Sequence, residues 1–382
     1  MTKSLPRVVA LLLTLGLLAA ACGDDEADGP IEQQPAQAEP EPAEPEPADE
    51  PEPAEEPEPA EEPEPADEPE PAEEPEPAEE PEPADEPLRV AFFGFAAANG
   101  FAQATWAGIQ EGAAAIGAEV EFFDPVFDAN TQISQIQDAI TAGDWDAFVI
   151  QANDGNAVIP VIEEALAAGI PVVGEFTPIG PDYSTIEPQV EGLIFVGAAP
   201  VDNGVILAEM AIEACAGTSP CNVAFLEGFR FLPLDVARTD AFHSTIAAAD
   251  GVELLASVEG GYLPDTGLSA AQDVFVAHGD VHVMVGSSQA ILGAEQAAND
   301  AEVSVKLIGN GGARQAVDAV REGRWHGVFL DAERDAGRTA FELAVQAATG
   351  GNPPSSFDAT TLVPNVKGTA DVIGDFEGQW EI

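Results

Sequence analysis

The fold of this chain is decided by residues 147–176, which read AFVIQANDGNAVIPVIEEALAAGIPVVGEF. The run 147–150 has the length and apolar composition of a buried strand, and residues 157–168 have the apolar spacing of a helix. Residues 170–176 form a second apolar strand after a glycine that ends the helix. A strand, a helix and a strand in this order are typical of parallel strands joined by a crossover helix.

The same alternation continues on both sides of this stretch. Further strands are expected at 89–94, 119–123, 193–196, 222–226, 252–257, 281–285, 305–308 and 327–330. Further helices are expected at 101–117, 131–142, 205–214, 236–249, 290–299, 314–321 and 336–349. These strands are too many for one small sheet, so the sequence predicts an α/β protein with two Rossmann-like lobes, each built on a parallel sheet.

The first residues have the order of parts found in a secretory signal peptide. Lys3 and Arg7 precede an apolar run at 8–18, and small residues follow it up to Cys22. The run is too short for a comfortable membrane span. The junction LLAAAC, residues 17–22, resembles a bacterial lipobox, in which the cysteine is acylated after the signal is removed. We therefore expect a signal peptide at 1–21 and a lipid on Cys22; the alternative is an ordinary cleaved signal with an incidental cysteine.

Residues 22–87 are dominated by an acidic repeat of the type PEPAEE. Such a segment has almost no apolar side chains to bury, and its prolines and like charges favour an extended, disordered chain. The sequence predicts a tether that spaces the remaining residues from the membrane. Binding of another protein to this proline-rich run is the alternative role.

Charge restricts the possible partners. The chain has 70 acidic and 12 basic residues, for a formal net charge of −58. A surface this acidic repels nucleic acid and anionic membranes, so we expect neither as a partner, and contact with the membrane only through the lipid. Few lysines and many acids are also typical of proteins from salty habitats.

Cys215 and Cys221 lie on either side of a short segment that contains glycine and proline. In an exported protein such a pair favours a local disulfide. Two free thiols are the alternative, and a metal pair is disfavoured because no histidine lies near in the sequence.

Few other motifs suggest chemistry. Residues 309–312 lack the third spaced glycine of a dinucleotide loop, and the chain has neither a phosphate-binding G-x-x-x-x-G-K-[ST] loop nor a G-x-S-x-G nucleophile elbow. His278 and His282 are better explained as the start of a strand than as metal ligands. Glu333 and Asp335 are expected at a solvated helix start, where carboxylates suit the helix dipole. The sequence thus predicts no enzyme activity, cofactor or metal.

Seven segments together resemble the ribose-binding-like group of type 1 periplasmic binding proteins, the solute receptors of ABC importers. They are 99–101, 132–138, 146–150, 165–173, 238–242, 292–294 and 308–312. The resemblance implies two lobes joined by crossover hinge strands, which close around a small solute. It places the N-terminal lobe at 88–197 plus 331–360 and the C-terminal lobe at 198–330 plus 361–382.

The resemblance also implies where the solute binds. The expected ligand-binding residues are Phe95, Asn99, Phe101, Phe176, Thr177, Val236, Ser287, Asn310 and Asp331. Asn99 and Phe101 match the family's first loop. The Asp-Arg pair that grips sugar hydroxyls falls on Phe176 and Thr177 here, and a sugar-binding arginine falls on Val236. For Asp331, a hinge residue bonded to backbone amides is an equal alternative.

These replacements leave aromatic faces and negative charge, so we expect a neutral or cationic solute. A sugar-like or polyol solute is the leading expectation, with a nucleoside or amine second. The implied protein is a monomeric, membrane-tethered extracytoplasmic receptor that delivers its solute to ABC permease subunits. The alternative is a sensory binding module that feeds a chemoreceptor or sensor kinase.

Overall fold

The computed structural model describes residues 87–382. The predicted signal peptide 1–21, Cys22 and the tether up to residue 86 lie outside the described residues. Within the described part of the chain, no helix is long and apolar enough to cross a membrane.

The first sheet has six strands in the order β11-β5-β4-β3-β1-β2, and all neighbours in it are parallel. Its strands are β1 (Arg89–Phe93), β2 (Glu119–Phe123), β3 (Ala147–Ile150), β4 (Val172–Glu175), β5 (Ile194–Gly197) and β11 (Ser356–Asp358). All four residues of β3 are buried, as a strand covered on both faces requires.

The second sheet also has six strands, in the order β12-β10-β9-β8-β6-β7. Its strands are β6 (Cys221–Glu227), β7 (Val252–Glu259), β8 (Val283–Ser287), β9 (Lys306–Asn310), β10 (Gly327–Phe329) and β12 (Lys367–Gly368). The short edge strand β12 is antiparallel to β10, and the other neighbours are parallel.

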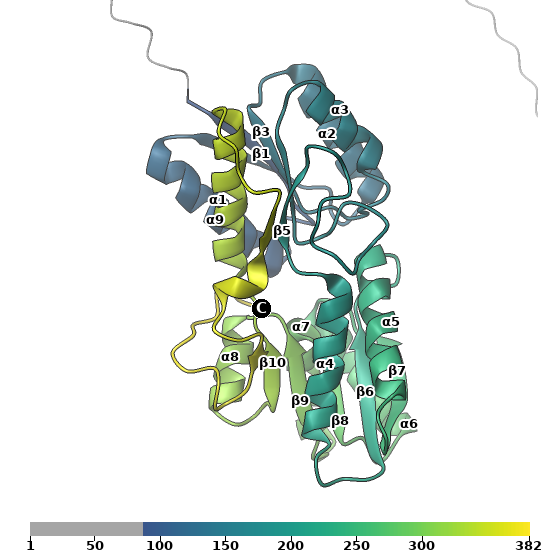
Figure 1. The fold of residues 1–382 in the computed structure, drawn as a ribbon. Coiled ribbons are helices and arrows are strands. Elements are labelled where there is room, and N and C mark those ends of the chain that lie inside the picture. Colours follow the sequence, from purple (N-terminus) through teal and green to yellow (C-terminus); the bar gives the residue numbers. More distant parts are fainter. Residues whose placement is uncertain (1–86) are drawn as a thin grey trace, which may run out of the picture. The chain divides into compact units, whose positions relative to one another are not determined.

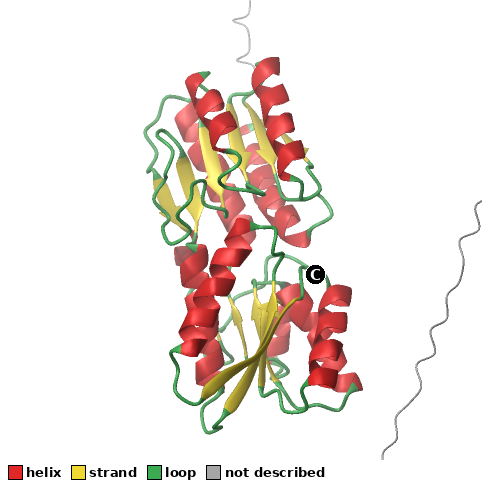
Figure 2. Cartoon of the chain, turned by 90° about the vertical axis from the view of Figure 1, so that its right-hand side faces the viewer, coloured by secondary structure: helices red, strands yellow, loops and turns green. Residues whose placement is uncertain are grey.

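Helices cover both faces of each sheet (Figures 1 and 2). The first sheet has α1 (Gly100–Ile116) and α9 (Glu333–Ala348) on one face, and α2 (Ala129–Ala142) and α3 (Ile159–Ala167) on the other. The second sheet has α4 (Pro200–Ala214) and α5 (Pro233–Ala247) on one face, and α6 (Pro264–Ala277), α7 (Ser288–Asp300) and α8 (Arg314–Arg321) on the other.

Apolar cores fill the layers between sheets and helices. Phe148 of β3 and Phe242 of α5 are fully buried, and each such side chain stabilises the fold by about 1.5–3 kcal/mol relative to exposure. Where α1 and α9 cross, Gly108 lies so close to the Arg334 carbonyl that a side chain would not fit. Close packing therefore fixes α9 against the first sheet, although α9 follows β10 of the second sheet in the chain.

The chain passes between the sheets three times, as Figure 1 shows. The passages run from β5 to α4, from β10 to α9, and from β11 through the short helix η1 (Ala359–Leu362) to β12. The predicted α/β fold class with two parallel sheets joined by crossovers is confirmed. That the two halves move as separate lobes with the predicted boundaries stays a prediction.

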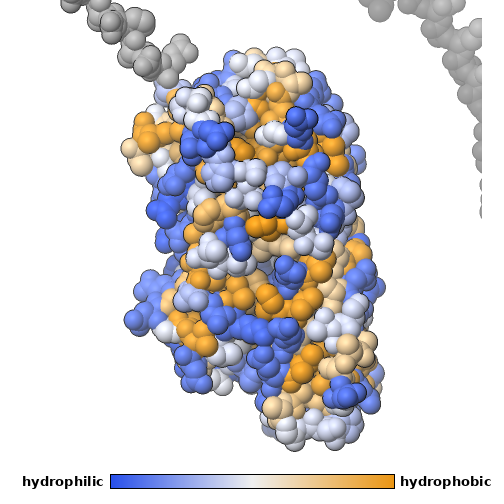
Figure 3. Space-filling model, in the orientation of Figure 1, coloured by the Kyte–Doolittle hydropathy of each residue, from blue (hydrophilic) through white to orange (hydrophobic). Residues whose placement is uncertain are grey.

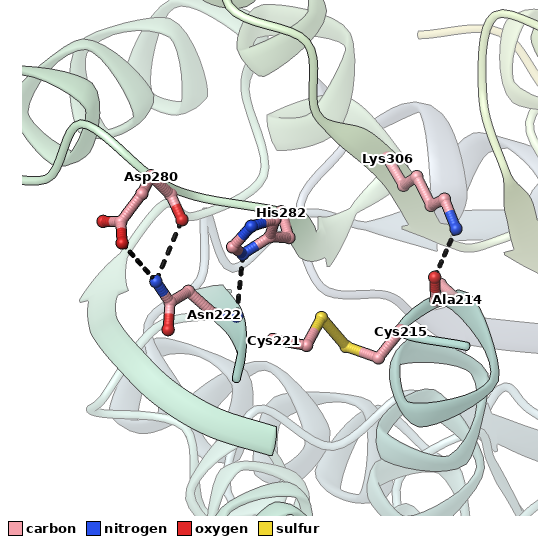
Figure 4. The surroundings of a disulfide bond; sticks show 7 residues. All are labelled: Ala214, Cys215, Cys221, Asn222, Asp280, His282 and Lys306. Carbon is pink, nitrogen blue, oxygen red and sulfur yellow. Dashed lines mark hydrogen bonds between the residues drawn. A yellow bond between two sulfur atoms is a disulfide. The ribbon is translucent and has the colours of Figure 1, made fainter. Parts of the chain in front are cut away.

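The predicted disulfide between Cys215 and Cys221 is present (Figure 4). It joins the residue after α4 to the first residue of β6, and both cysteines are buried. Next to it, the Asn222 side chain donates to Asp280, the Lys306 ammonium donates to the Ala214 carbonyl, and His282 Nδ1 accepts the Asn222 amide. His282 thus lies directly before β8 and links it to β6 through a hydrogen bond, which agrees with the strand start that the sequence indicates.

Removing the disulfide is expected to lower the free energy of unfolding. The loop it closes has a sequence separation of only 6 residues, so the loss should be on the order of 2 kcal/mol. Urea unfolding of Cys215→Ser/Cys221→Ser against the parent measures this change. Alkylation of both thiols in the native protein without reduction would contradict the pairing itself.

Candidate functional site

A cavity lies where strand ends of the first sheet approach those of the second. It contains about 1040 Å³ of space free of atoms, counting its opening to solvent. On the face drawn in Figure 3, apolar and polar side chains are mixed on both halves. Six of the nine residues predicted to bind a solute line this cavity: Phe95, Asn99, Phe101, Phe176, Asn310 and Asp331.

Aromatic rings form one wall. Phe176 follows β4, and its ring centre lies 4.6 Å from that of Phe101 and 6.0 Å from that of Phe95. Phe176 has a φ of +63°, a conformation that residues other than glycine rarely adopt and that costs about 1–3 kcal/mol. Trp380, from the C-terminal segment, completes this wall at 6.0 Å from Phe101.

Asn99 has a structural task at the cavity. Its Oδ1 accepts a hydrogen bond of 3.0 Å from the Ala102 amide and so caps the N-terminus of α1. The cap fixes the start of the helix, which places Phe101 in the first turn. The motif 99–101 therefore orients an aromatic side chain toward the cavity.

Polar groups on the side of the second sheet bond one another. Arg238 is buried; its guanidinium donates to Asp235 Oδ1 and, at 2.5 Å, to Asn203 Oδ1. The Tyr262 hydroxyl donates to the same Asp235 carboxylate, and Asn203 donates to Asn310 Oδ1 at 3.1 Å. Asp235 thus balances the charge of Arg238, and this part of the cavity carries little net charge.

Acidic side chains on the side of the first sheet lack such a partner. Glu175 ends β4 and Glu333 begins α9; they are 1 % and 2 % exposed, and both line the cavity. Thr105 donates to Glu333 Oε1 at 2.9 Å, and the Gln151 amide donates to Glu175 Oε2 at 2.7 Å. The expectation that Glu333 is solvated is wrong, because the crossover into α9 brings its first turn against α1 and the cavity.

Burial changes the acidity of these groups. Removal from water raises the pKa of Glu175 to about 7, and hydrogen bonds only partly offset this. Burial also raises the pKa of Glu333 well above its ordinary value, and the neighbouring Glu175 raises it further. For Asp331 burial raises the pKa to about 6, against the opposing hydrogen bond of 2.7 Å from the Gly312 amide. Asp331 therefore lines the cavity and also bonds to backbone.

Three predicted site residues lie outside the lining of this cavity. Ser287 accepts from the Ala290 amide and donates to the Gly261 carbonyl, so its hydroxyl caps α7 and holds a loop. Val236 is 43 % exposed and borders a separate, polar hollow between Glu227 and His243. Thr177 is buried behind Phe176 and contributes no atom to the lining. A ligand-binding role for any of the nine residues stays a prediction.

The cavity includes polar and aromatic residues that sequence reasoning did not assign to it. They include Asn203, Arg238, Tyr262, Gln289, Glu333 and Trp380. Arg238 lies in the segment 238–242, which resembles the family, so the sequence did hold a signal for its place at the cavity. Trp380 lies far along the chain from every motif, and tertiary contacts bring it there, among them its backbone contact with residues 313–314 and the hydrogen bonds of Gln379 with Asp335.

The arrangement suits binding rather than a reaction. Among residues 87–382, no group of three or more histidine, cysteine or acidic side chains could hold a metal ion. The cavity instead offers aromatic faces, amides and carboxyls, which are the groups that orient a small molecule.

Because Glu175 and Glu333 are buried, we predict that the free energy of unfolding falls as the pH rises. Below about pH 4.5, Glu175 is protonated both folded and unfolded; between there and about pH 7, only the folded state keeps the proton. Glu175→Gln should therefore raise the free energy of unfolding at pH 8 by roughly 1–3 kcal/mol, with little change at pH 4.5. Urea unfolding at both pH values checks this, with the exposed Glu342→Gln on α9 as control. A pH dependence equal to that of the parent would contradict the assignment.

Comparison with known proteins agrees with this geometry. The ribose import binding protein of Bacillus subtilis (strain 168) is 25 % identical over 238 residues, covering 62 % of this chain and 74 % of that protein. A solute-binding protein from Bacillus halodurans C-125 with bound myo-inositol shares the fold at a TM-score of 0.66 and 20 % identity, covering 77 % of this chain and 99 % of that one. One from Mycobacterium smegmatis with bound glycerol has a TM-score of 0.62 and 26 % identity, covering 72 % and 92 %.

The family model of the periplasmic binding protein domain matches residues 90–352. This range includes ten of the twelve strands and all nine α-helices that the structure describes. Proteins of this kind bind solutes and do not act as enzymes, as the predicted absence of catalytic residues implied. The chain therefore belongs to the periplasmic binding protein domain family, in its type 1, ribose-binding group.

Proposed function

We propose that this protein is the extracytoplasmic, lipid-tethered receptor of an ABC importer, and that it binds a small sugar-like or polyol solute. The observation that carries the proposal is the cavity, which is lined by loops from both sheets at the three chain passages. Relatives described as binding ribose, myo-inositol and glycerol support a small polyhydroxylated solute.

The cavity has a chemistry that fits such a solute. Aromatic faces such as Phe101 stack on the C–H side of a sugar ring, and the amides of Asn203 and Asn310 can bond its hydroxyls. The loss of the charged pair at Phe176 and Thr177 argues against plain ribose or glucose as the preferred solute.

The way a solute is held implies motion of the two halves. The passages between the sheets are short, and all three border the cavity, through Gly197 and Ala198, Leu330–Glu333, and Thr360. A solute that contacts both sides favours the closed arrangement by its differential affinity. We propose the lobe boundaries given by the sequence analysis as the moving units.

Solute binding is expected to raise the melting temperature and to compact the described part of the chain. A thermal-shift screen of sugars, polyols and nucleosides in high salt should identify binders, and small-angle scattering of residues 87–382 should then show a smaller radius of gyration.

Asn310→Ala should weaken binding about tenfold, because one hydrogen bond in the cavity is lost, whereas the exposed Asn130→Ala should not. Confirmed binding without compaction would contradict closure, and no binder in the screen would contradict the proposed function.

The lipid anchor is tested separately from the solute. Cys22→Ser should move the protein from the detergent phase to the aqueous phase, or leave the signal uncleaved, because no acylated cysteine remains. Ala27→Ser, five residues further on, is the matched control and should partition like the parent. Unchanged partitioning of Cys22→Ser would show that another feature holds the protein at the membrane.

A further inference from the structure

The buried carboxyls at the cavity have fewer donors than they need. Among the described residues, Gln151 and Thr105 donate to the Glu175 and Glu333 side chains, and the two carboxyls also bond each other, with one of them protonated. The Gln151 amide nitrogen also donates to the Thr105 hydroxyl at 2.7 Å, so the same few protons are shared around the cluster. Apart from the proton between the two carboxyls, their four oxygens have two donor side chains.

The side-chain oxygen of Gln151 also lacks a hydrogen-bond donor. Its side chain is fully buried among Thr105, Glu175 and Glu333, and its Oε1 accepts no hydrogen bond. A buried acceptor without a donor costs roughly 1–3 kcal/mol. The cluster is thus rich in acceptors and poor in donors, and its members Glu175 and Glu333 line the cavity, where a donor-rich group of a ligand could reach them.

Among the described residues, no cation pairs with these two carboxyls. Arg238, the cation in the cavity lining, is engaged by Asp235, Asn203 and Tyr262 on the opposite side. Asp331 adds a third acidic group to the lining. The groups that face the pair are Thr105 of α1, Gln151 after β3, and Asp331 between β10 and α9, and none of them is positive.

The walls beside the carboxyls favour positive charge as well. Phe95, Phe101 and Phe176 present aromatic rings to the cavity, and the negative face of an aromatic ring attracts a cation. A buried carboxylate is stable only when it is neutralised or paired with a cation. A protonated amine supplies up to three N–H donors and one positive charge in a single small group.

We infer that the solute is a hydroxylated amine, an aminated sugar or polyol, whose ammonium group binds at Glu175 and Glu333. This inference rests on the proposed function and narrows its solute class. The hydroxyls of such a solute would be held by the Asn203 and Asn310 side, and its ammonium by the carboxyl side. The asymmetry of the cavity thus gives the solute an orientation.

The test compares neutral solutes with their aminated counterparts in the full-length protein. The pairs are myo-inositol with an aminodeoxyinositol, D-glucose with D-glucosamine, and glycerol with 3-amino-1,2-propanediol. Isothermal titration near pH 7.5 should show at least one amine binding about tenfold or more tightly than its neutral partner, because a hydrogen bond to a charged group is the stronger kind. N-acetyl-D-glucosamine keeps the nitrogen but not the charge and should lose the advantage of D-glucosamine.

Variants assign the preference to the buried pair. Glu333→Gln and Glu175→Gln keep shape and remove charge, and each should reduce the ratio of amine affinity to neutral-partner affinity about tenfold. Asp335→Asn removes a charge from the same turn of α9 outside the cavity and should leave the preference intact. Affinity for the amine should also fall between pH 7 and pH 5, as Glu175, whose pKa burial raises to about 7, takes up a proton.

Each outcome decides between the inference and the proposed function. Equal affinities within every pair, or tighter binding of the neutral members, would overturn the inference and leave the proposed function standing. A preference for amines that survives both glutamine variants would also overturn it, since another group would then bind the ammonium. Binding of neither member of any pair would overturn the inference and count against the proposed function as well.

Discussion

Parallel pairing of strands is the constraint on which the rest of this structure depends. Two neighbouring parallel strands cannot be joined by a tight turn, so a helix has to return the chain across a face of the sheet each time. Every strand then ends at the same edge, and every following loop and helix N-terminus gathers there. Asn99 after β1, Glu175 at the end of β4 and Asn310 at the end of β9 reach the cavity for this reason. The passages between the sheets turn these two edges toward one another.

The elements that obey this constraint could be predicted from the sequence, and those that depend on tertiary contact could not. Strand β3 was expected with its observed bounds, Ala147–Ile150, because a buried strand must be apolar along its whole length. Glu333 looked like a solvated residue at a helix start, since local sequence does not reveal that α9 packs against α1. Trp380 could not be placed at the cavity at all, because tertiary contacts such as the bridge to Ala313 and the Gln379–Asp335 hydrogen bonds position it there. The cavity's aromatic side was thus foreseen, while the pairing of its charges was not.

The two sides of the cavity satisfy their polar groups in different ways. On the second-sheet side, Arg238, Asp235 and Tyr262 form a closed network in which each buried group has a partner. Such a network is rigid, and it has little to gain from a ligand. On the first-sheet side, Glu175 and Glu333 stand together, and burial raises the pKa of Glu175 to about 7. A buried carboxyl with a raised pKa in a cavity is a candidate for contact with a ligand, so we infer that this side contributes more to affinity than the other.

The backbone conformation at Phe176 fixes the positions of both the aromatic ring and the neighbouring carboxyl. A φ of +63° is unfavourable for phenylalanine, and the amide of this residue is held by the Val196 carbonyl at 2.9 Å. The strained turn directs the ring toward Phe101 and Phe95 immediately after Glu175 ends the strand. Ring and carboxyl are therefore fixed next to each other by one local conformation. A substitution that relaxed this turn would move both groups, so the aromatic wall and the acidic pair cannot vary independently.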